Sequence, residues 1–235
     1  MAMEWQEWVA GVIREEESAL PKKHLIAQNI CNFQFDLDTL PQGISMVNFH
    51  YALPGAVQMN LDLGGVIGLD ETGFMPHKDE IYLDQAWRFI LSGGGLYNNL
   101  DYSFTADTEQ GDWSIPDTNP GWGGPGFREK LAILVETINR VPFHEMEFSG
   151  SILDAGEGKL KQYGIQKEGE IYLLFAENLT DAVLIPQVPS SNYEVSYINV
   201  DTGEEETETL NLGNGEAISS SFSGDRVAIM LRKSE

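Results

Sequence analysis

The chain has 235 residues and is 42% hydrophobic, so it can bury the core of one large domain or two small ones. Its 14 Lys and Arg against 37 Asp and Glu give a formal charge of -23, which repels nucleic-acid phosphates and anionic membrane surfaces. We therefore expect no nucleic-acid or membrane partner, whereas neutral ligands and Ca²⁺ stay compatible with this charge.

The N-terminal segment predicts a helix rather than a targeting signal. Tryptophans and several acids stand where a signal peptide would need basic residues and an apolar core, and no later stretch is long enough to span a bilayer. The lone Cys31 rules out an intramolecular disulfide. As written, the chain is expected to be soluble and cytoplasmic without an export signal, and its compartment is otherwise unknown. Helical spacing, closed by Pro21, predicts an amphipathic helix over about 4–19 with apolar residues Trp5, Trp8, Val9, Val12 and Ile13.

The middle of the chain predicts a parallel α/β sheet. Short apolar runs without alternation are typical of strands buried on both faces, and two later segments have the 3.6-residue period of helices. Strands that alternate with helices of this length indicate βαβ units. The predicted strands cover 24–30, 44–49, 65–69 and 96–104, and the predicted helices cover 80–92 and 126–140.

After Pro142 the pattern changes to short strands separated by glycine-containing turns. This spacing predicts a small antiparallel β-sandwich, and hence two domains, 1–144 and 145–235. The predicted strands of the second domain cover 160–166, 170–176, 182–186, 193–199, 206–212 and 226–232.

Polar residues follow each predicted parallel strand. Because ligands approach the carboxyl ends of such strands, these residues predict a polar floor for a hydroxyl-rich ligand. Two tryptophans in the following loop could stack on sugar rings. The candidate binding residues are Asn29, Asn48, Asp70, Asn98, Asn99, Asp101, Trp113 and Trp122.

Glu71 is the candidate reactive residue. A carboxylate at the end of an apolar strand is partly desolvated and needs hydrogen-bond donors, which Tyr51 or His50 could supply. Spacing alone leaves open the alternative that Glu71 caps the next segment or pairs with a surface cation. The motifs of zinc proteases, serine hydrolases and nucleotide-binding enzymes do not occur in the sequence, so we expect no metal and no cofactor.

Five segments stand out as familiar: NFHYA (48–52), GLDETGF (68–74), AWRFILSGGGLYNNLDYSF (86–104), GGPGFREKLAILVETIN (123–139) and DRVAIMLRK (225–233). The first four resemble the second half of clan A (β/α)8 glycoside hydrolases, particularly cellulase-like bacterial proteins, and the last resembles the end of that family's C-terminal β-sandwich. The resemblance implies a half barrel of four parallel βα units followed by a β-sandwich domain, and a retaining glycosidase with Glu71 as nucleophile, oriented by His50 and Tyr51. It implies a carbohydrate substrate.

The chain also departs from that family. A complete barrel takes about 250 residues, whereas fewer than 145 precede the predicted sandwich. The family's acid/base, supplied by the fourth barrel strand, would lie outside the four predicted strands, and Glu71 cannot act both as nucleophile and as acid. Glu109 is a nearby loop acid, for which a solvated surface role is the simpler interpretation. Open strand edges and an apolar interior predict a homodimer, or a higher oligomer, that completes the barrel.

Three functional hypotheses follow. The first is a glycosidase-like half barrel that is active only if a partner chain or loop supplies the acid/base. The second is a catalytically inactive carbohydrate-binding or structural remnant. The third is an interaction module in which the sandwich binds through exposed Trp and Tyr side chains.

Overall fold

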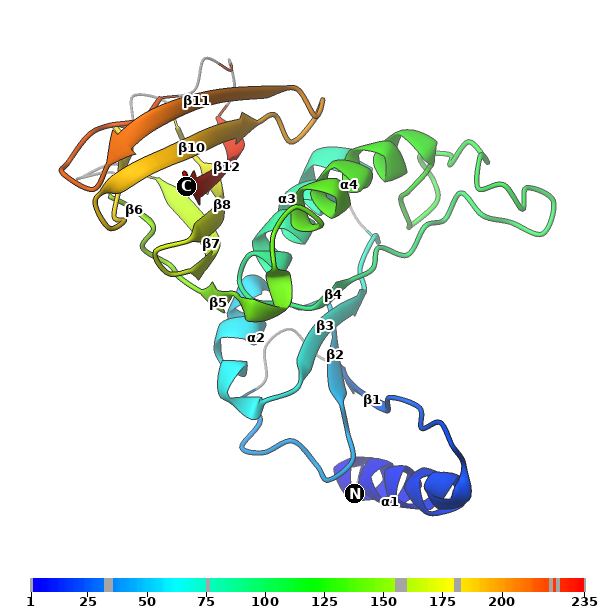
Figure 1. The fold of residues 1–235 in the computed structure, drawn as a ribbon. Coiled ribbons are helices and arrows are strands. Elements are labelled where there is room, and N and C mark those ends of the chain that lie inside the picture. The colour runs from blue at the N-terminus through cyan, green and yellow to red at the C-terminus, as the bar shows by residue number, and fades with distance from the viewer. Residues whose placement is uncertain are drawn as a thin grey trace.

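The computed structural model describes residues 2–31, 36–74, 77–154, 160–179, 183–219, 222 and 225–234. Its parallel sheet contains β1 (Ala27–Cys31), β2 (Met46–His50), β3 (Val66–Glu71) and β4 (Leu96–Tyr97), in that spatial order (Figure 1). All three strand pairings are parallel, as the sequence predicts.

The predicted strand over 96–104 is wrong beyond Tyr97. The chain leaves the ladder at Asn98, although the backbone N–H of Leu100 still donates to the carbonyl of Thr72 at 2.8 Å. From there the backbone satisfies its hydrogen bonds within turns, such as the paired bonds between Thr105 and Thr108. Polar and turn-forming residues therefore replace a strand that the aromatic content of the segment had favoured.

Helices α2 (Pro54–Gln58), α3 (Asp79–Ile90) and α4 (Pro125–Ile138) lie on one face of the parallel sheet, whereas α1 (Ala2–Glu16) lies apart from them, near β1. Short 3-10 turns occur at Glu17–Ala19, Leu61–Leu63 and Phe143–Glu145. Short α2 was not predicted, because its five residues are too few to show a helical period. Among the described helices, none has both the length and the apolarity needed to cross a membrane. The core beneath α2 and α3 includes Val47, Phe49, Ala56, Val57, Ile67, Leu69 and Phe89.

The C-terminal part is an antiparallel β-sandwich, as predicted. A six-stranded sheet has the order β11-β10-β12-β8-β7-β5 and is faced by the small pair β6-β9. The predicted boundary after residue 144 stays a prediction. The strands are β5 (Glu147–Phe148), β6 (Leu153–Asp154), β7 (Lys161–Lys167), β8 (Ile171–Glu177), β9 (Ile185–Pro186), β10 (Ser191–Ile198), β11 (Glu205–Leu212) and β12 (Arg226–Lys233).

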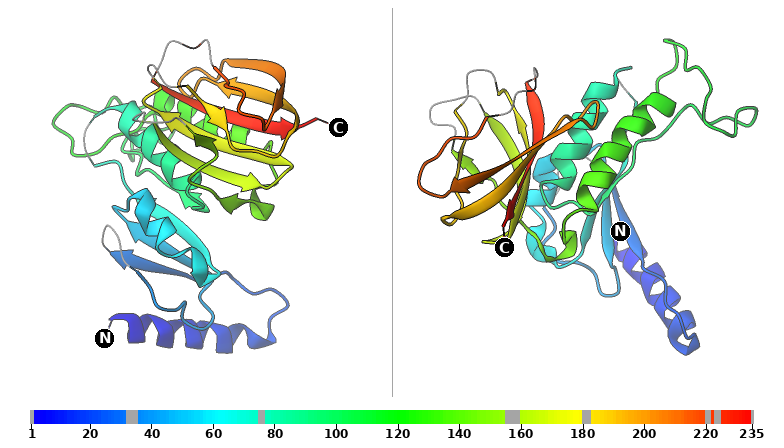
Figure 2. Two further views of the ribbon diagram at one scale, coloured as in Figure 1. Left: turned by 90° about the vertical axis from the view of Figure 1, so that its left-hand side faces the viewer. Right: turned by 45° about the horizontal axis from the view of Figure 1, so that its top comes forward.

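Helices α3 and α4 lie between the parallel sheet and the six-stranded sheet (Figure 2). Fully buried Trp87 of α3 stacks on Phe175 of β8, with ring centroids 5.9 Å apart and planes at 23°. At the same contact, Arg226 of β12 pairs with Asp84 and Asp201. The sandwich therefore covers the helical layer and leaves the opposite face of the parallel sheet uncovered by it.

That opposite face is the open face of the parallel sheet. Residues paired across parallel strands point to the same side, so Asn29, Asn48, Gly68 and Leu96 form one row on it. Helix α1 lies near the β1 edge, where the Gln6 side chain donates to the carbonyl of Asn29 at 3.4 Å (Figure 1).

Candidate functional site

A β-bulge places Glu71 on the open face. The pairing between β2 and β3 shifts after Phe49, so that His50 lies opposite Glu71 instead of Asp70. Strict alternation from Gly68 would turn Glu71 toward the helices, and the extra residue reverses that direction. His50, Asp70 and Glu71 thereby meet at the carboxyl end of the sheet.

Two neighbouring side chains contact the Glu71 carboxylate. The Tyr51 hydroxyl donates to Oε1 at 3.1 Å, and the His50 Nδ1 contacts Oε2. The Glu71 side chain is 27% exposed, so it is partly desolvated but open to a ligand. The expected grouping of His50, Tyr51 and Glu71 is therefore present, whereas their chemical roles stay predictions.

His50 also faces a second carboxylate. Its Nε2 lies 3.2 Å from Asp70 Oδ1, although the geometry of this contact does not satisfy a hydrogen bond. A neutral imidazole donates from one nitrogen only, whereas a protonated one donates from both. The ring is thus held between two acids, which fixes the orientation that it presents to Glu71.

Tyr51 adopts a backbone conformation that is rare for its residue type. Its φ is 59°, and its N–H donates to the carbonyl of Glu71 at 3.1 Å. A non-glycine residue in this left-handed region costs about 1–3 kcal/mol and is found at functional sites. This conformation carries the tyrosine hydroxyl to the Glu71 carboxylate.

An amide floor extends from Glu71 along the open face. Asn48 is 8% exposed, and its Oδ1 has no hydrogen-bond partner among the described residues. Gly68 is required beside it, because an added Cβ would lie 2.3 Å from that oxygen. Asn29 occupies the same row on β1, and Asn98 donates to the carbonyl of Asp70 at 3.2 Å. The structure therefore brings Asp70 and Asn98 beside Glu71 and places Asn48 and Asn29 further along the same open face.

Asp101 and Asn99 instead hold the connection that follows β4. Asp101 Oδ1 accepts from the N–H of Ser103 at 2.9 Å and of Gly124 at 3.0 Å, and Oδ2 contacts Arg128. Burial alone would raise the pKa of the Asp101 carboxyl, but the bonds from Ser103 and Arg128 outweigh it and lower that pKa. Buried Asn99 donates to the carbonyls of Leu100 and Trp122. Their predicted contact with a ligand stays a prediction.

The two predicted stacking tryptophans lie in different surroundings. Trp122 donates from Nε1 to Asp79 at 2.8 Å and stacks on His77, with centroids 5.2 Å apart. Trp113 lines a shallow pocket of about 420 Å³ between residues 100 and 119. Glu109 is an exposed acid of the same loop.

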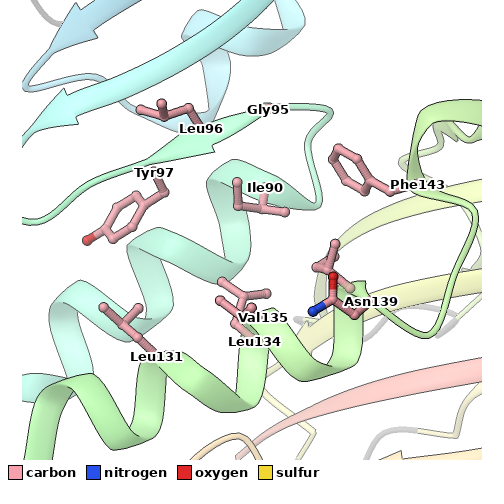
Figure 3. Close-up of a pocket in the computed structure, with 10 residues that line it drawn as sticks. Ile90, Gly95, Leu96, Tyr97, Leu131, Leu134, Val135, Asn139 and Phe143 are labelled. Atoms are coloured by element: carbon pink, nitrogen blue, oxygen red, sulfur yellow. The ribbon is translucent and has the colours of Figure 1, made fainter.

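An apolar cavity lies on the other side of the sheet, among the helices. It has a volume of about 380 Å³ and lies between β4, α3 and α4, with Leu131, Leu134 and Phe143 in its wall (Figure 3). Its lining offers few polar groups for hydroxyls. Glu71 lines neither this cavity nor the pocket at Trp113, and lies instead on the open face. In the described part of the chain, no group of three or more His, Cys, Asp or Glu side chains is placed to hold a metal ion.

Among the described residues, the structure places few aromatic side chains on the surface of the sandwich, so binding through such side chains stays a prediction. Tyr172, Tyr193 and Tyr197 are buried in its core, partly buried Tyr163 packs against the helical layer, and no tryptophan follows Trp122 in the sequence. Burial raises the pKa of the Tyr193 hydroxyl to about 12, helped by neighbouring Tyr172. Phe74 was not predicted as part of the site, yet its ring lies between those of Tyr51 and Tyr102. Its position in GLDETGF, three residues after Glu71, was the available signal.

Known structures share this fold. A structure described as a glycoside hydrolase matches with a TM-score of 0.62 and 10% identity, over 98% of this chain and 69% of its own. A glycoside hydrolase family 5 structure from Bacteroides vulgatus ATCC 8482 matches with a TM-score of 0.68 and 11% identity, over 96% of this chain. This chain spans 57% of that protein.

At these identities the likeness concerns the fold alone. The expected half barrel with a β-sandwich is thus confirmed as a glycoside hydrolase-like fold, similar to family 5 structures. No family model matches the sequence, and no curated protein matches it significantly.

Proposed function

We propose that this chain is a glycoside hydrolase-like protein of the retaining type, with Glu71 as the nucleophile, and that it acts on a carbohydrate when a partner chain or loop supplies the acid/base. One observation carries the proposal. The bulged end of β3 presents Glu71 on the open face of a glycosidase-like sheet, with Tyr51 and His50 on its two oxygens.

The proposed reaction has two steps. Glu71 attacks the anomeric carbon, the glycosidic C–O bond breaks, and the leaving oxygen takes a proton from the acid/base. Water then attacks the glycosyl ester, gives its proton to the same acid/base and releases Glu71. Tyr51 and His50 hold the carboxylate in one orientation during attack. The amides of Asn48 and Asn98 supply hydrogen bonds to the sugar hydroxyls.

A second copy of this chain is the proposed source of the acid/base. Among the described strands, β1 and β4 each pair on one side only, and Val66 on the open face is 40% exposed. Unpaired strand edges and exposed apolar side chains favour association. Light scattering coupled to size-exclusion chromatography is expected to give at least twice the mass of one chain at micromolar concentration, and the monomer mass would contradict this.

Dinitrophenyl glycosides test the nucleophile without the acid/base. Their leaving group departs without protonation, so Glu71 alone is sufficient for the first step. We expect release of dinitrophenol from one of the glucosides, mannosides or xylosides, and a loss of at least 100-fold in Glu71→Gln. Glu109→Gln is the matched control, since it removes an exposed loop acid, and it should keep the wild-type rate. An unchanged rate in Glu71→Gln would overturn the proposal.

The second candidate is a carbohydrate-binding protein without turnover. The amide side chains of Asn29 and Asn98 favour it, because Asn29 is exposed on the open face and Asn98 lies beside Asp70. Amide groups can hydrogen-bond sugar hydroxyls whether or not a bond is cleaved. Equal binding of an oligosaccharide by wild type and Glu71→Gln, with no dinitrophenol release by either, would support this candidate.

A further inference from the structure

The connection between β4 and α4 contains a pocket that the Glu71 cluster does not use. Its volume of about 420 Å³ falls within the range of about 300–1,000 Å³ typical of small-molecule sites. Aromatic rings and polar side chains line it together, which suits a ligand with both apolar faces and hydroxyl groups. The rings belong to Tyr102, Phe104 and Trp113, and the polar side chains to Asp101, Thr105 and Asn119.

The pocket is held in shape by a network of hydrogen bonds. Arg128 of α4 bonds to Asp101 and donates from Nη2 to the carbonyl of Gly111 at 2.8 Å. The buried Ser103 Oγ lies 2.6 Å from Asp101 Oδ1 and 2.7 Å from the Gly111 carbonyl oxygen, so its single O–H can donate to either acceptor. These bonds cross-link the two sides of the connection. A ligand would therefore meet a site that is largely formed before binding.

The Phe104 ring contacts Arg128 on one side and is otherwise exposed. The Arg128 guanidinium carbon lies 4.9 Å from the ring centroid, and Gly111 leaves room for the ring, because an added Cβ would lie 2.4 Å from it. Even so, Phe104 stays 50% exposed. A half-exposed aromatic ring supported on one side is suited to stacking on the apolar face of a sugar.

A continuous row of aromatic rings joins this pocket to the nucleophile. The rings of Tyr51 and Phe74 have centroids 5.4 Å apart, and those of Phe74 and Tyr102 are 6.4 Å apart. Tyr51 begins the row at Glu71, and Tyr102 ends it in the pocket wall. In Figure 1 this connection extends outward from the carboxyl end of β4. A ligand lying along the row would thus reach from Glu71 to the pocket.

We infer that this pocket is a distal carbohydrate subsite, which binds a neutral sugar unit of an oligo- or polysaccharide whose cleaved bond lies at Glu71. The inference rests on the proposed function for the position of that bond. Asn119 keeps its Nδ2 donor unused among the described residues, while its Oδ1 accepts from the N–H of Gly121 at 2.8 Å. The formal charge of -23 disfavours anionic sugars such as uronates. The substrate class is therefore an extended neutral glycan rather than a single glycoside.

Chain-length dependence of binding tests the inference. In the full-length Glu71→Gln chain, which prevents turnover, calorimetry compares cellotetraose, mannotetraose and xylotetraose with glucose, mannose and xylose. We expect one tetrasaccharide to bind at least 10-fold more tightly than its own monosaccharide. Trp113→Ala and Phe104→Leu should each remove most of that gain. Trp8→Ala is the matched control, because Trp8 is 65% exposed on α1, and it should keep the gain.

The outcomes separate this inference from the proposed function. Dinitrophenol release from a single-sugar glycoside requires Glu71 but not the distal pocket. If that release persists while no tetrasaccharide gains affinity, or while the gain survives both pocket variants with native thermal melting, the subsite is overturned and the Glu71 proposal stands. If the gain depends on Trp113 but no dinitrophenol is released, the subsite stands and the nucleophile proposal fails.

Discussion

At the residue scale, the candidate site depends on the junction between β2 and β3. Tyr51 takes a left-handed backbone conformation, and the neighbouring bulge turns Glu71 to the open face. The sequence identified Glu71, His50 and Tyr51 as a group, because polar residues at the ends of adjacent parallel strands converge. It could not predict the bulge or the positive φ, since neither leaves a periodic signal in the residues.

Removal of the Tyr51 hydroxyl is expected to make Glu71 a less effective nucleophile. Tyr51→Phe keeps the ring and its 5.4 Å contact with Phe74 but deletes the bond to Oε1. A hydrogen bond to a charged group contributes about 1.5–3 kcal/mol, so the rate of dinitrophenol release should fall about 10- to 100-fold. Thermal melting should stay within a few degrees of wild type. An unchanged rate would show that Tyr51 does not position the nucleophile.

Asp101 makes the stability of the connection after β4 depend on pH. Its carboxyl pKa is lowered in the folded chain, because the bonds from Ser103 and Arg128 outweigh burial. The stabilisation is therefore complete above the ordinary aspartate pKa of about 3.9 and is lost as pH falls through the lowered folded value. Asp101→Asn should lower the free energy of unfolding by about 1–3 kcal/mol at pH 7.

Near pH 2, the free energy of unfolding of Asp101→Asn should differ much less from that of wild type. Urea denaturation at the two pH values, followed by tryptophan fluorescence, measures both differences. Asp107 is an exposed aspartate of the same loop, so Asp107→Asn should leave the free energy of unfolding unchanged at both pH values. An equal cost for Asp101→Asn at both pH values would contradict the role of the charged form.

At the element scale, the sequence predicted most strands and the three longer helices, because their apolar periods are long enough to recognise. The segment 96–104 departs from the predicted strand after Tyr97. Tyr97, Tyr102 and Phe104 favour a strand by composition, yet the latter two line a turn-rich pocket wall after the ladder has ended. The tertiary hydrogen bonds of Ser103 and Arg128, far apart in sequence, decide that shape.

The packing of the α3 and α4 layer against the six-stranded sheet depends on Trp87. This side chain is fully buried and stacks on Phe175 across the contact with the six-stranded sheet. Trp87→Ala should lower the free energy of unfolding by about 3–5 kcal/mol, as expected for a large cavity in a packed core. Urea denaturation measures the change. Trp5→Ala, at a 63% exposed tryptophan of α1, should change it by less than about 0.5 kcal/mol.

At the scale of the whole molecule, the fold defines where a ligand can approach. One side of the parallel sheet is closed by α2 and α3, and the sandwich covers the outer side of the helical layer (Figure 2). The open face, with Asn48 and Glu71, is the side that remains for a ligand or a second copy of the chain. The sequence predicted this architecture through its resemblance to glycoside hydrolases, and structures of that class share the fold.

Trapping of the glycosyl ester tests the central claim most directly. The chain would be incubated with 2-deoxy-2-fluoro dinitrophenyl glycosides, whose slow second step preserves the intermediate, and digested for mass spectrometry. We predict one added glycosyl mass on the peptide that contains Glu71, and no such mass in Glu71→Gln. A label on another residue, or equal labelling of Glu71→Gln, would show that this carboxylate is not the nucleophile.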